Sequence, residues 1–240
     1  MGDAGLMKED ILSICLRTYA SEAILALRLY DIGAIKFGSF ELKNPALSPS
    51  PVYLNLRDEH HPEEESRGPL AQLDFEMIAG ELFRVIKASG VEYDLISGIP
   101  YAGEPISKEF ARFLPNGDSK NLKLVKSGKG KSRKISRVIN PEKYSEGKAG
   151  NRVLLLDDVV SGADSKFEAI NALEAVGYEI AALAVLVDRE QGGSKKLTDA
   201  GYKFICWKTL TDLMDFYLCR VRVSWEEFKA VKKYIKEHKI

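Results

Sequence analysis

The feature that most constrains this chain is a short stretch in which a buried strand runs directly into two acidic residues. Four apolar residues at 153–156 are followed by Asp157 and Asp158, and then by the small-residue turn 161–163. An unbroken apolar run of this length is typical of a strand covered on both faces. Residues 164–176 have the pattern of a helix that ends at Gly177. Because a helix start offers backbone N–H groups and a positive dipole end, the stretch predicts a phosphate site.

The two carboxylates narrow the kind of ligand that this phosphate site accepts. Like charges repel, so Asp157 and Asp158 do not bind the phosphate itself. They fit a ligand that carries hydroxyl groups beside its phosphate, such as a ribose 5-phosphate, with magnesium balancing the charge elsewhere. The alternative is that the two residues only cap the following helix, although capping requires one aspartate and not two.

The rest of the chain alternates between strand-like and helix-like segments. We expect strands near 94–99, 122–125, 153–156, 180–187 and 204–207, and helices near 72–90, 104–113, 164–176, 209–217 and 225–236. This order predicts an α/β fold with a central parallel sheet flanked by helices, and ligands at the carboxyl ends of the strands. Residues 8–30 have helical spacing, 37–42 and 52–56 look extended, and the basic stretch 126–150 predicts a long loop.

Composition excludes several classes of protein. The chain of 240 residues is 45% apolar and carries equal numbers of acidic and basic residues, so we expect neither nucleic acid nor a membrane as a partner. We expect the three widely spaced cysteines to be ordinary thiols and the location to be cytoplasmic. The adjacent His60 and His61 lack the spacing of metal ligands, so we expect no metal site formed by protein side chains alone.

Residues 153–165 resemble the diphosphoribose-binding motif of type I phosphoribosyltransferases. That resemblance implies that Asp157 and Asp158 hold the ribose hydroxyls and that one of them steadies positive charge at the sugar during transfer. It also implies that the loop binds the 5-phosphate of the donor, 5-phosphoribosyl 1-diphosphate, through Ser161, Gly162, Ala163, Asp164 and Ser165. The turn at 97–103 resembles the pyrophosphate loop of the orotate branch, which implies donor contacts from Tyr101 and Ala102.

Two further segments resemble orotate phosphoribosyltransferases and concern the base. Residues 36–43 and 50–53 match a pattern that forms a small hood over the base, and 186–193 match a segment whose arginine reaches it. A guanidinium suits the planar carboxylate of orotate, so Arg189 is expected to select orotate over uracil. The alternative for Lys43 is an exposed strand lysine. The resemblance implies orotate contacts from Lys43, Tyr53, Leu54, Ser161 and Arg189.

The chain departs from the family pattern in two places. The loop that carries a catalytic lysine in the family aligns with residues 125–132, which lack the usual arginine and glutamate. We expect Lys129 to be catalytic and Lys126 and Lys131 to bind the donor, against the alternative of a solvated basic loop. The donor loop has Gly162 before Ala163, followed by an additional acid. That acid, Asp164, either weakens donor binding or caps the helix.

The sequence thus predicts a type I phosphoribosyltransferase fold in a single domain, 1–240, with N-terminal helices and a hood at about 1–57 and an α/β core at about 72–240. The expected activity joins orotate to the donor with magnesium, giving orotidine 5'-monophosphate and pyrophosphate in pyrimidine biosynthesis. A loop that closes over a neighbouring subunit implies a homodimer. The alternatives are a regulator that binds the donor or a nucleotide without turnover, and a transferase for another base.

Overall fold

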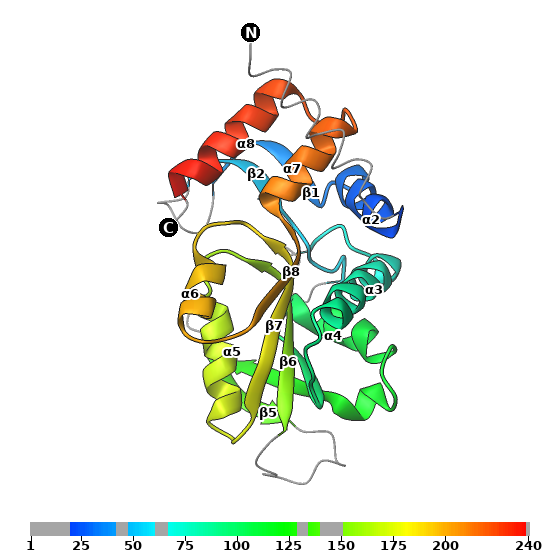
Figure 1. The fold of residues 1–240 in the computed structure, drawn as a ribbon, viewed down its shortest axis with the longest axis vertical. Helices are drawn as coiled ribbons and strands as arrows, with labels where there is room; N and C mark the ends of the chain where they lie inside the picture. The colour runs from blue at the N-terminus through cyan, green and yellow to red at the C-terminus, as the bar shows by residue number, and fades with distance from the viewer. Residues whose placement is uncertain (1–19, 42–47, 61–66, 129–133, 140–150, 239–240) are drawn as a thin grey trace. The chain divides into compact units, whose positions relative to one another are not determined.

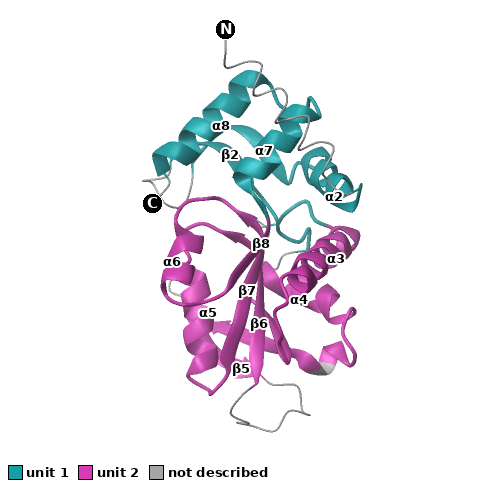
Figure 2. Ribbon diagram, in the orientation of Figure 1, with its two compact units in different colours: residues 1–70, 208–240 teal, residues 71–207 magenta. Residues whose placement is uncertain are grey.

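The computed structural model describes residues 20–41, 48–60, 67–128, 134–139 and 151–238. Its larger unit, residues 71–207, contains a six-stranded sheet in the order β5-β4-β3-β6-β7-β8 (Figures 1 and 2). Strand β3 is parallel to both β4 and β6, and β6 is parallel to β7. The α/β fold with a mainly parallel sheet is therefore confirmed. The strands are β3 (Leu95–Gly98), β4 (Asn121–Ser127), β5 (Lys134–Ile139), β6 (Arg152–Val160), β7 (Glu179–Asp188) and β8 (Phe204–Thr209).

Helices cover both faces of this sheet. Helices α3 (Gln72–Ala88) and α4 (Gly103–Ala111) lie on one face, and α5 (Asp164–Glu174) and α6 (Gly193–Asp199) lie on the other (Figure 1). A short 3-10 turn, η3 (Gly117–Lys120), precedes β4. The apolar core on the α5 side includes Val153 and Leu155 of β6 together with Ala169, Ile170 and Leu173 of the helix. Because side chains alternate along a strand, the next residue in that series is Asp157.

Strand β5 corrects the expectation that residues 126–150 form one long loop. It runs antiparallel to β4 at the edge of the sheet, pairing Lys123 with Ile139 and Ser127 with Lys134. Most of its side chains are exposed or half-buried. An edge strand of this kind needs no continuous apolar face, so its basic sequence did not reveal it.

The smaller unit consists of residues 1–70 and 208–240 (Figure 2). It contains α2 (Ala20–Asp31), an antiparallel pair of β1 (Ile35–Phe40) and β2 (Ser50–Leu54), and the helices α7 (Leu210–Cys219) and α8 (Trp225–His238). The sequence predicts that α7 and α8 belong to the α/β core. They group with the N-terminal segment instead, because the buried Tyr217 hydroxyl donates to the Ala26 carbonyl over 2.8 Å and Lys208 pairs with Glu22 at 2.9 Å.

The cysteines differ in state. Cys206 is a free thiol, whereas Cys219 is disulfide-bonded, so the expectation of ordinary thiols is wrong for Cys219. None of the helices in the described part of the chain is long and apolar enough to cross a membrane.

A buried carboxylate ties α3 to the end of the sheet and generates a stability prediction. Glu81 accepts hydrogen bonds from the Trp207 indole at 3.1 Å and from Arg84 at 2.8 and 3.0 Å, all at the same oxygen. We expect Glu81→Ala to lower the free energy of unfolding by about 2 kcal/mol, because the buried indole N–H loses its acceptor. Urea unfolding measures this value.

The matched control is Glu92→Ala. Glu92 pairs with Arg152 at 3.3 Å on the surface, where the Glu92 side chain is 81% exposed. An exposed pair contributes little, so this variant should change the free energy of unfolding by less than about 0.5 kcal/mol. Equal losses in the two variants would contradict the role assigned to Glu81.

Candidate active site

The carboxyl ends of β3 and β6 meet at the point where the strand order reverses, the usual place for a ligand in such a sheet. Gly98 of β3 pairs with Leu156 of β6, and the Ile99 amide donates to the Leu156 carbonyl over 2.9 Å. A Cβ on Gly103 would lie 2.3 Å from that same carbonyl, and one on Gly98 would lie 2.2 Å from the Gly103 carbonyl. Only glycine permits this backbone approach, so the two predicted loops are held side by side.

The loop after β3 receives one of the predicted donor residues. The Lys126 ammonium of β4 donates to the Pro100 carbonyl over 3.0 Å and lies 5.9 Å from the centroid of the Tyr101 ring. The structure thus brings Lys126 and Tyr101 together beside Ala102, the residue before α4. The predicted Lys129 and Lys131 lie outside the described residues.

The donor loop connects β6 to α5 without a side-chain cap. Ala163 is the residue before the helix, with a left-handed backbone at φ 71°, and its side chain caps nothing. The helix begins at Asp164, which corrects the suggestion that this residue is the cap. Asp164 is exposed, and one of its carboxylate oxygens lies 3.9 Å from where a Cβ on Gly162 would be. The Lys166 and Phe167 amides donate to the Ala163 carbonyl over 3.0 Å, which leaves the amides of Asp164 and Ser165 at the start of α5 as the ones that suit an anion.

The segment after β7 packs against the donor loop. The Arg189 amide donates to the Val160 carbonyl over 3.0 Å, and the Arg189 residue is 9% exposed. A Cβ on Gly193 would lie 2.3 Å from the Ser161 carbonyl and 2.7 Å from a Val160 methyl group. The structure therefore brings the predicted Arg189 and Ser161 into one place. Gly193 was missed as a functional residue, because a glycine in sequence does not reveal which backbone it touches.

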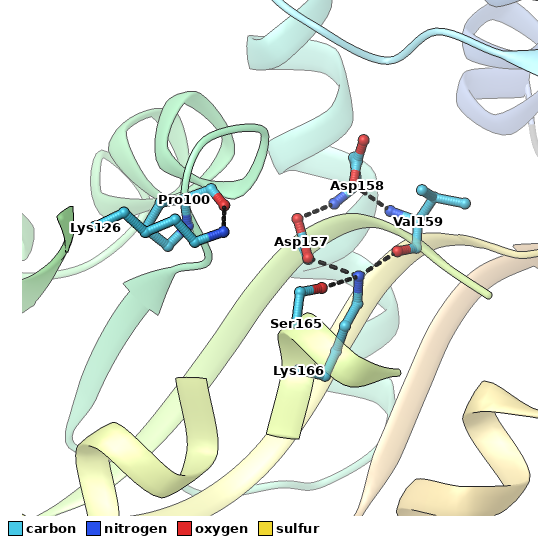
Figure 3. A network of polar contacts seen from close by, with 7 residues as sticks. All are labelled: Pro100, Lys126, Asp157, Asp158, Val159, Ser165 and Lys166. Carbon is cyan, nitrogen blue, oxygen red and sulfur yellow. Dashed lines mark hydrogen bonds and ion pairs between the residues drawn. The ribbon is translucent and has the colours of Figure 1, made fainter. Parts of the chain in front are cut away.

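The two carboxylates have different surroundings, as Figure 3 shows. Asp157 is 4% exposed and one of its oxygens contacts the Lys166 ammonium at 2.8 Å. Its other oxygen accepts a hydrogen bond from the Asp158 amide at 2.9 Å. Asp158 is half-buried, and one of its own oxygens accepts from the Val159 amide at 2.7 Å. Lys166 was not among the predicted residues, since no spacing rule identifies a buried lysine.

Burial and charge shift the proton affinities of this group. Burial, followed by the negative charge of Asp157, raises the pKa of Asp158 to about 8, against the opposing effect of Lys166. Burial lowers the pKa of the Lys166 ammonium, but the charges of Asp157 and Asp158 outweigh it, so that pKa is raised overall. Lys166 is therefore a cation throughout the neutral range.

The remaining predicted residues lie in the smaller unit or outside the described residues. Tyr53 and Leu54 belong to β2, where the Tyr53 ring stacks on Phe40 with 5.6 Å between centroids. Lys43 and His61 fall outside the described residues. Within the part of the chain that the structure describes, no three His, Cys, Asp or Glu side chains gather closely enough to hold a metal ion.

The raised pKa of Asp158 makes stability depend on pH. Its carboxyl ordinarily titrates at 3.8 and does so at about 8 in the folded protein. Between these values the folded state keeps a proton that the unfolded state has released, so the free energy of unfolding falls as pH rises. We expect a shallower fall in Asp158→Asn, measured by urea unfolding across that range. The control Asp199→Asn removes an exposed carboxylate and should keep the wild-type slope; equal slopes for Asp158→Asn and the wild type would contradict the shift.

Comparison with known proteins agrees with this geometry. The model of the phosphoribosyl transferase domain matches residues 70–208. An orotate phosphoribosyltransferase from Pyrobaculum aerophilum is 30% identical over 215 residues, which cover 88% of this chain and 97% of that protein. The uridine 5'-monophosphate synthase of Bos taurus is 28% identical over 221 residues, 89% of this chain but only 40% of its own length.

Solved structures give the same result. The UMP synthase of Leishmania donovani superposes with a TM-score of 0.70 at 25% identity, covering 91% of this chain and 43% of that one. The chain thus spans less than half the length of these two UMP synthases and nearly all of the Pyrobaculum aerophilum transferase. The domain match extends over more than half of the chain and includes both loops at the meeting point of β3 and β6. This protein belongs to the phosphoribosyltransferase family of glycosyl-transferring enzymes, with orotate phosphoribosyltransferases among its relatives.

Proposed function

We propose that the chain transfers the ribose 5-phosphate group of 5-phosphoribosyl 1-diphosphate to orotate, releasing pyrophosphate and forming orotidine 5'-monophosphate. The observation that carries this proposal is the close packing of the β3 loop on the end of β6, through Gly98 and Gly103. It puts a turn suited to pyrophosphate next to carboxylates and a helix start suited to ribose 5-phosphate. The names of the relatives support orotate as the acceptor.

The donor would be held along its length by the two loops. The uncapped amides at the start of α5, with Ser161 to Ser165, would bind the 5-phosphate. Tyr101, Ala102 and Lys126 would contact the pyrophosphate end, and Asp158 the sugar hydroxyls. Catalysis would then require no covalent nucleophile, because positioning and fixed charge accelerate loss of the pyrophosphate. Lys129 stays our prediction for the cation that stabilises the departing group, and Lys131 stays our prediction for a donor contact.

The acceptor would be recognised by Arg189 and Ser161 of the larger unit. Arg189 and Ser161 would contact orotate, since the Arg189 amide donates to the carbonyl of Val160, the residue before Ser161. Lys43, Tyr53 and Leu54 stay our predictions for orotate contacts from the hood pattern of the sequence. A guanidinium can form two parallel hydrogen bonds with the carboxylate of orotate, which uracil lacks.

Magnesium fits this site as a companion of the donor. Mg²⁺ in proteins is commonly bound by few protein oxygens together with substrate phosphates. The diphosphate oxygens would therefore hold the ion, whose charge would neutralise the leaving pyrophosphate.

We also propose that the protein forms a homodimer. The cytoplasmic location stays a prediction from the sequence.

A second function is favoured by the two departures of the sequence from the family pattern. The stretch 125–132 lacks the arginine and glutamate of the family loop, and Asp164 places an additional negative charge at the phosphate site. These features support a regulator that binds the donor without turnover. A transferase for another base has less support, because Arg189 and the hood pattern are both present.

One assay separates these functions. The absorbance of orotate is followed with donor and magnesium, then with uracil in place of orotate, and then with magnesium chelated. We expect orotate to be consumed only in the first case. Donor binding by calorimetry without orotate consumption would favour the regulator, and consumption of uracil would favour another base.

Arg189 supplies the sharpest test of the acceptor. We expect Arg189→Met to raise the KM for orotate by more than about tenfold, equivalent to about 1.4 kcal/mol, while the KM for the donor is unchanged. The control Arg112→Met removes a guanidinium that is 61% exposed at the end of α4 and should leave both constants unchanged. A rise in the donor KM alone would assign Arg189 to the donor and not to the base.

Gly193 supplies a test of the donor loop. A methyl group on Gly193 would collide with the Ser161 carbonyl at 2.3 Å, so Gly193→Ala should displace the loop and weaken donor binding by about tenfold or more. Calorimetric titration with the donor measures this loss. In Gly80→Ala the new methyl group meets only Phe113 at 3.7 Å, so donor binding should stay at the wild-type level. Equal affinities in both variants would show that Gly193 does not position the loop.

A further inference from the structure

Lys166 is a buried cation beside the donor loop. It lies in the first turn of α5 and is 6% exposed. Its ammonium contacts the Asp157 carboxylate at 2.8 Å, donates to the Val159 carbonyl over 2.5 Å and lies 3.4 Å from the Ser165 hydroxyl (Figure 3). The first two contacts belong to the end of β6 and the third to α5. One side chain therefore joins the strand to the helix across the loop between them.

This contact gives the two neighbouring carboxylates different tasks. Asp157 follows Val153 and Leu155 on the face of β6 that packs on α5, and both of its oxygens have hydrogen-bonding or ionic partners. In Figure 3 the Asp158 carboxylate lies on the side of β6 away from Lys166. Asp158 is also the more exposed of the two. Asp158 is thus the carboxylate that is better placed to accept hydrogen bonds from the sugar hydroxyls of a ligand.

Charge balance supports the same division. Once Asp158 has released its proton, two adjacent charged carboxylates would stand, without Lys166, beside a ligand that is itself a polyanion, and repulsion would oppose binding. Lys166 cancels one of these charges. Of the other acids near the loop, Asp188 at the end of β7 accepts from the Glu190 amide over 2.8 Å, and Asp164 is exposed to solvent.

We propose that Lys166 is a positioning residue, which neutralises Asp157 and clamps the loop so that Asp158 alone meets the ribose hydroxyls. This inference rests on the proposed function, because it takes the ligand to be the diphosphoribosyl donor. It changes the equal roles that the sequence implied for Asp157 and Asp158. A buried ion pair is often replaceable by apolar residues without loss of stability, so the pair itself is a weak guide to stability and is better explained by the ligand.

A double-mutant cycle tests the proposal. Donor binding is titrated by calorimetry, and kcat and KM are measured, for Lys166→Met, Asp157→Asn and the combined variant. Each single change leaves one buried charge without its partner, so each should weaken donor binding by at least about tenfold. The combined variant removes both charges and should bind the donor more tightly than either single variant. If the two losses simply add, Asp157 contacts the sugar itself and the proposal is overturned.

The pH dependence of donor binding provides a second test, because a lysine with only a structural role would not change it. In Lys166→Met the two carboxylates lose their shared cation, so the acidic limb of donor binding should shift to higher pH, and the combined variant should reverse that shift. An unchanged limb in Lys166→Met would overturn the proposal. Thermal unfolding of each variant confirms that the folded protein is being titrated.

An exposed pair on α6 is the matched control. Lys195 contacts Asp199 at 3.2 Å, with both side chains more than 60% exposed. Lys195→Met, Asp199→Asn and their combination should all keep wild-type donor affinity.

Failure of the proposed function can be distinguished from failure of this inference. If the wild-type protein binds the donor but does not consume orotate, only the proposed acceptor is refuted. The double-mutant cycle on donor binding then still decides the role of Lys166. A wild-type protein that binds no donor overturns both.

Discussion

The contact on which the site depends is a backbone one. Gly98 and Gly103 allow the turn after β3 to lie against the Leu156 carbonyl, at distances that a side chain on either residue would forbid. Because Gly98 also pairs with Leu156 in the sheet, the ends of two neighbouring strands are fixed relative to each other. Gly193 repeats this device on the other side of β6, where it lies against Ser161. Three segments that are far apart in the sequence thereby converge on one strand end.

Two charged side chains around these strand ends each have a specific partner. Lys126 is attached to the Pro100 carbonyl, and Lys166 to Asp157 and the Val159 carbonyl. Both ammonium groups thus hold backbone in place as well as contributing charge. The Asp158 carboxyl keeps a proton to higher pH than an ordinary aspartate, since burial and Asp157 both disfavour its charged form. A ligand that offers hydroxyl groups to Asp158 and brings its own cation would change that balance, which links binding to proton release.

Much of the fold was accessible from the pattern of residues alone. The apolar run 153–156 and its neighbours predicted a mainly parallel sheet because buried strands leave a continuous apolar signature. The signature fails for β5, an edge strand with basic, mostly exposed side chains. The sequence pattern also does not place α7 and α8. Their amphipathic pattern shows that each helix has a buried face, but it does not show which element that face packs against. Tyr217, through its bond to the Ala26 carbonyl, assigns α7 to the N-terminal unit.

The sequence by itself determined the kind of site: a strand end with two carboxylates, a helix start suited to phosphate, and an arginine suited to a carboxylate base. Local chemistry suffices for this, because residue types and their spacing set which groups a loop can offer. Only the tertiary structure decided how the two carboxylates differ. Asp157 points toward α5 and meets Lys166, whereas Asp158 does not. That difference depends on which side of a strand each residue faces and on what packs there, and both are properties of the folded chain.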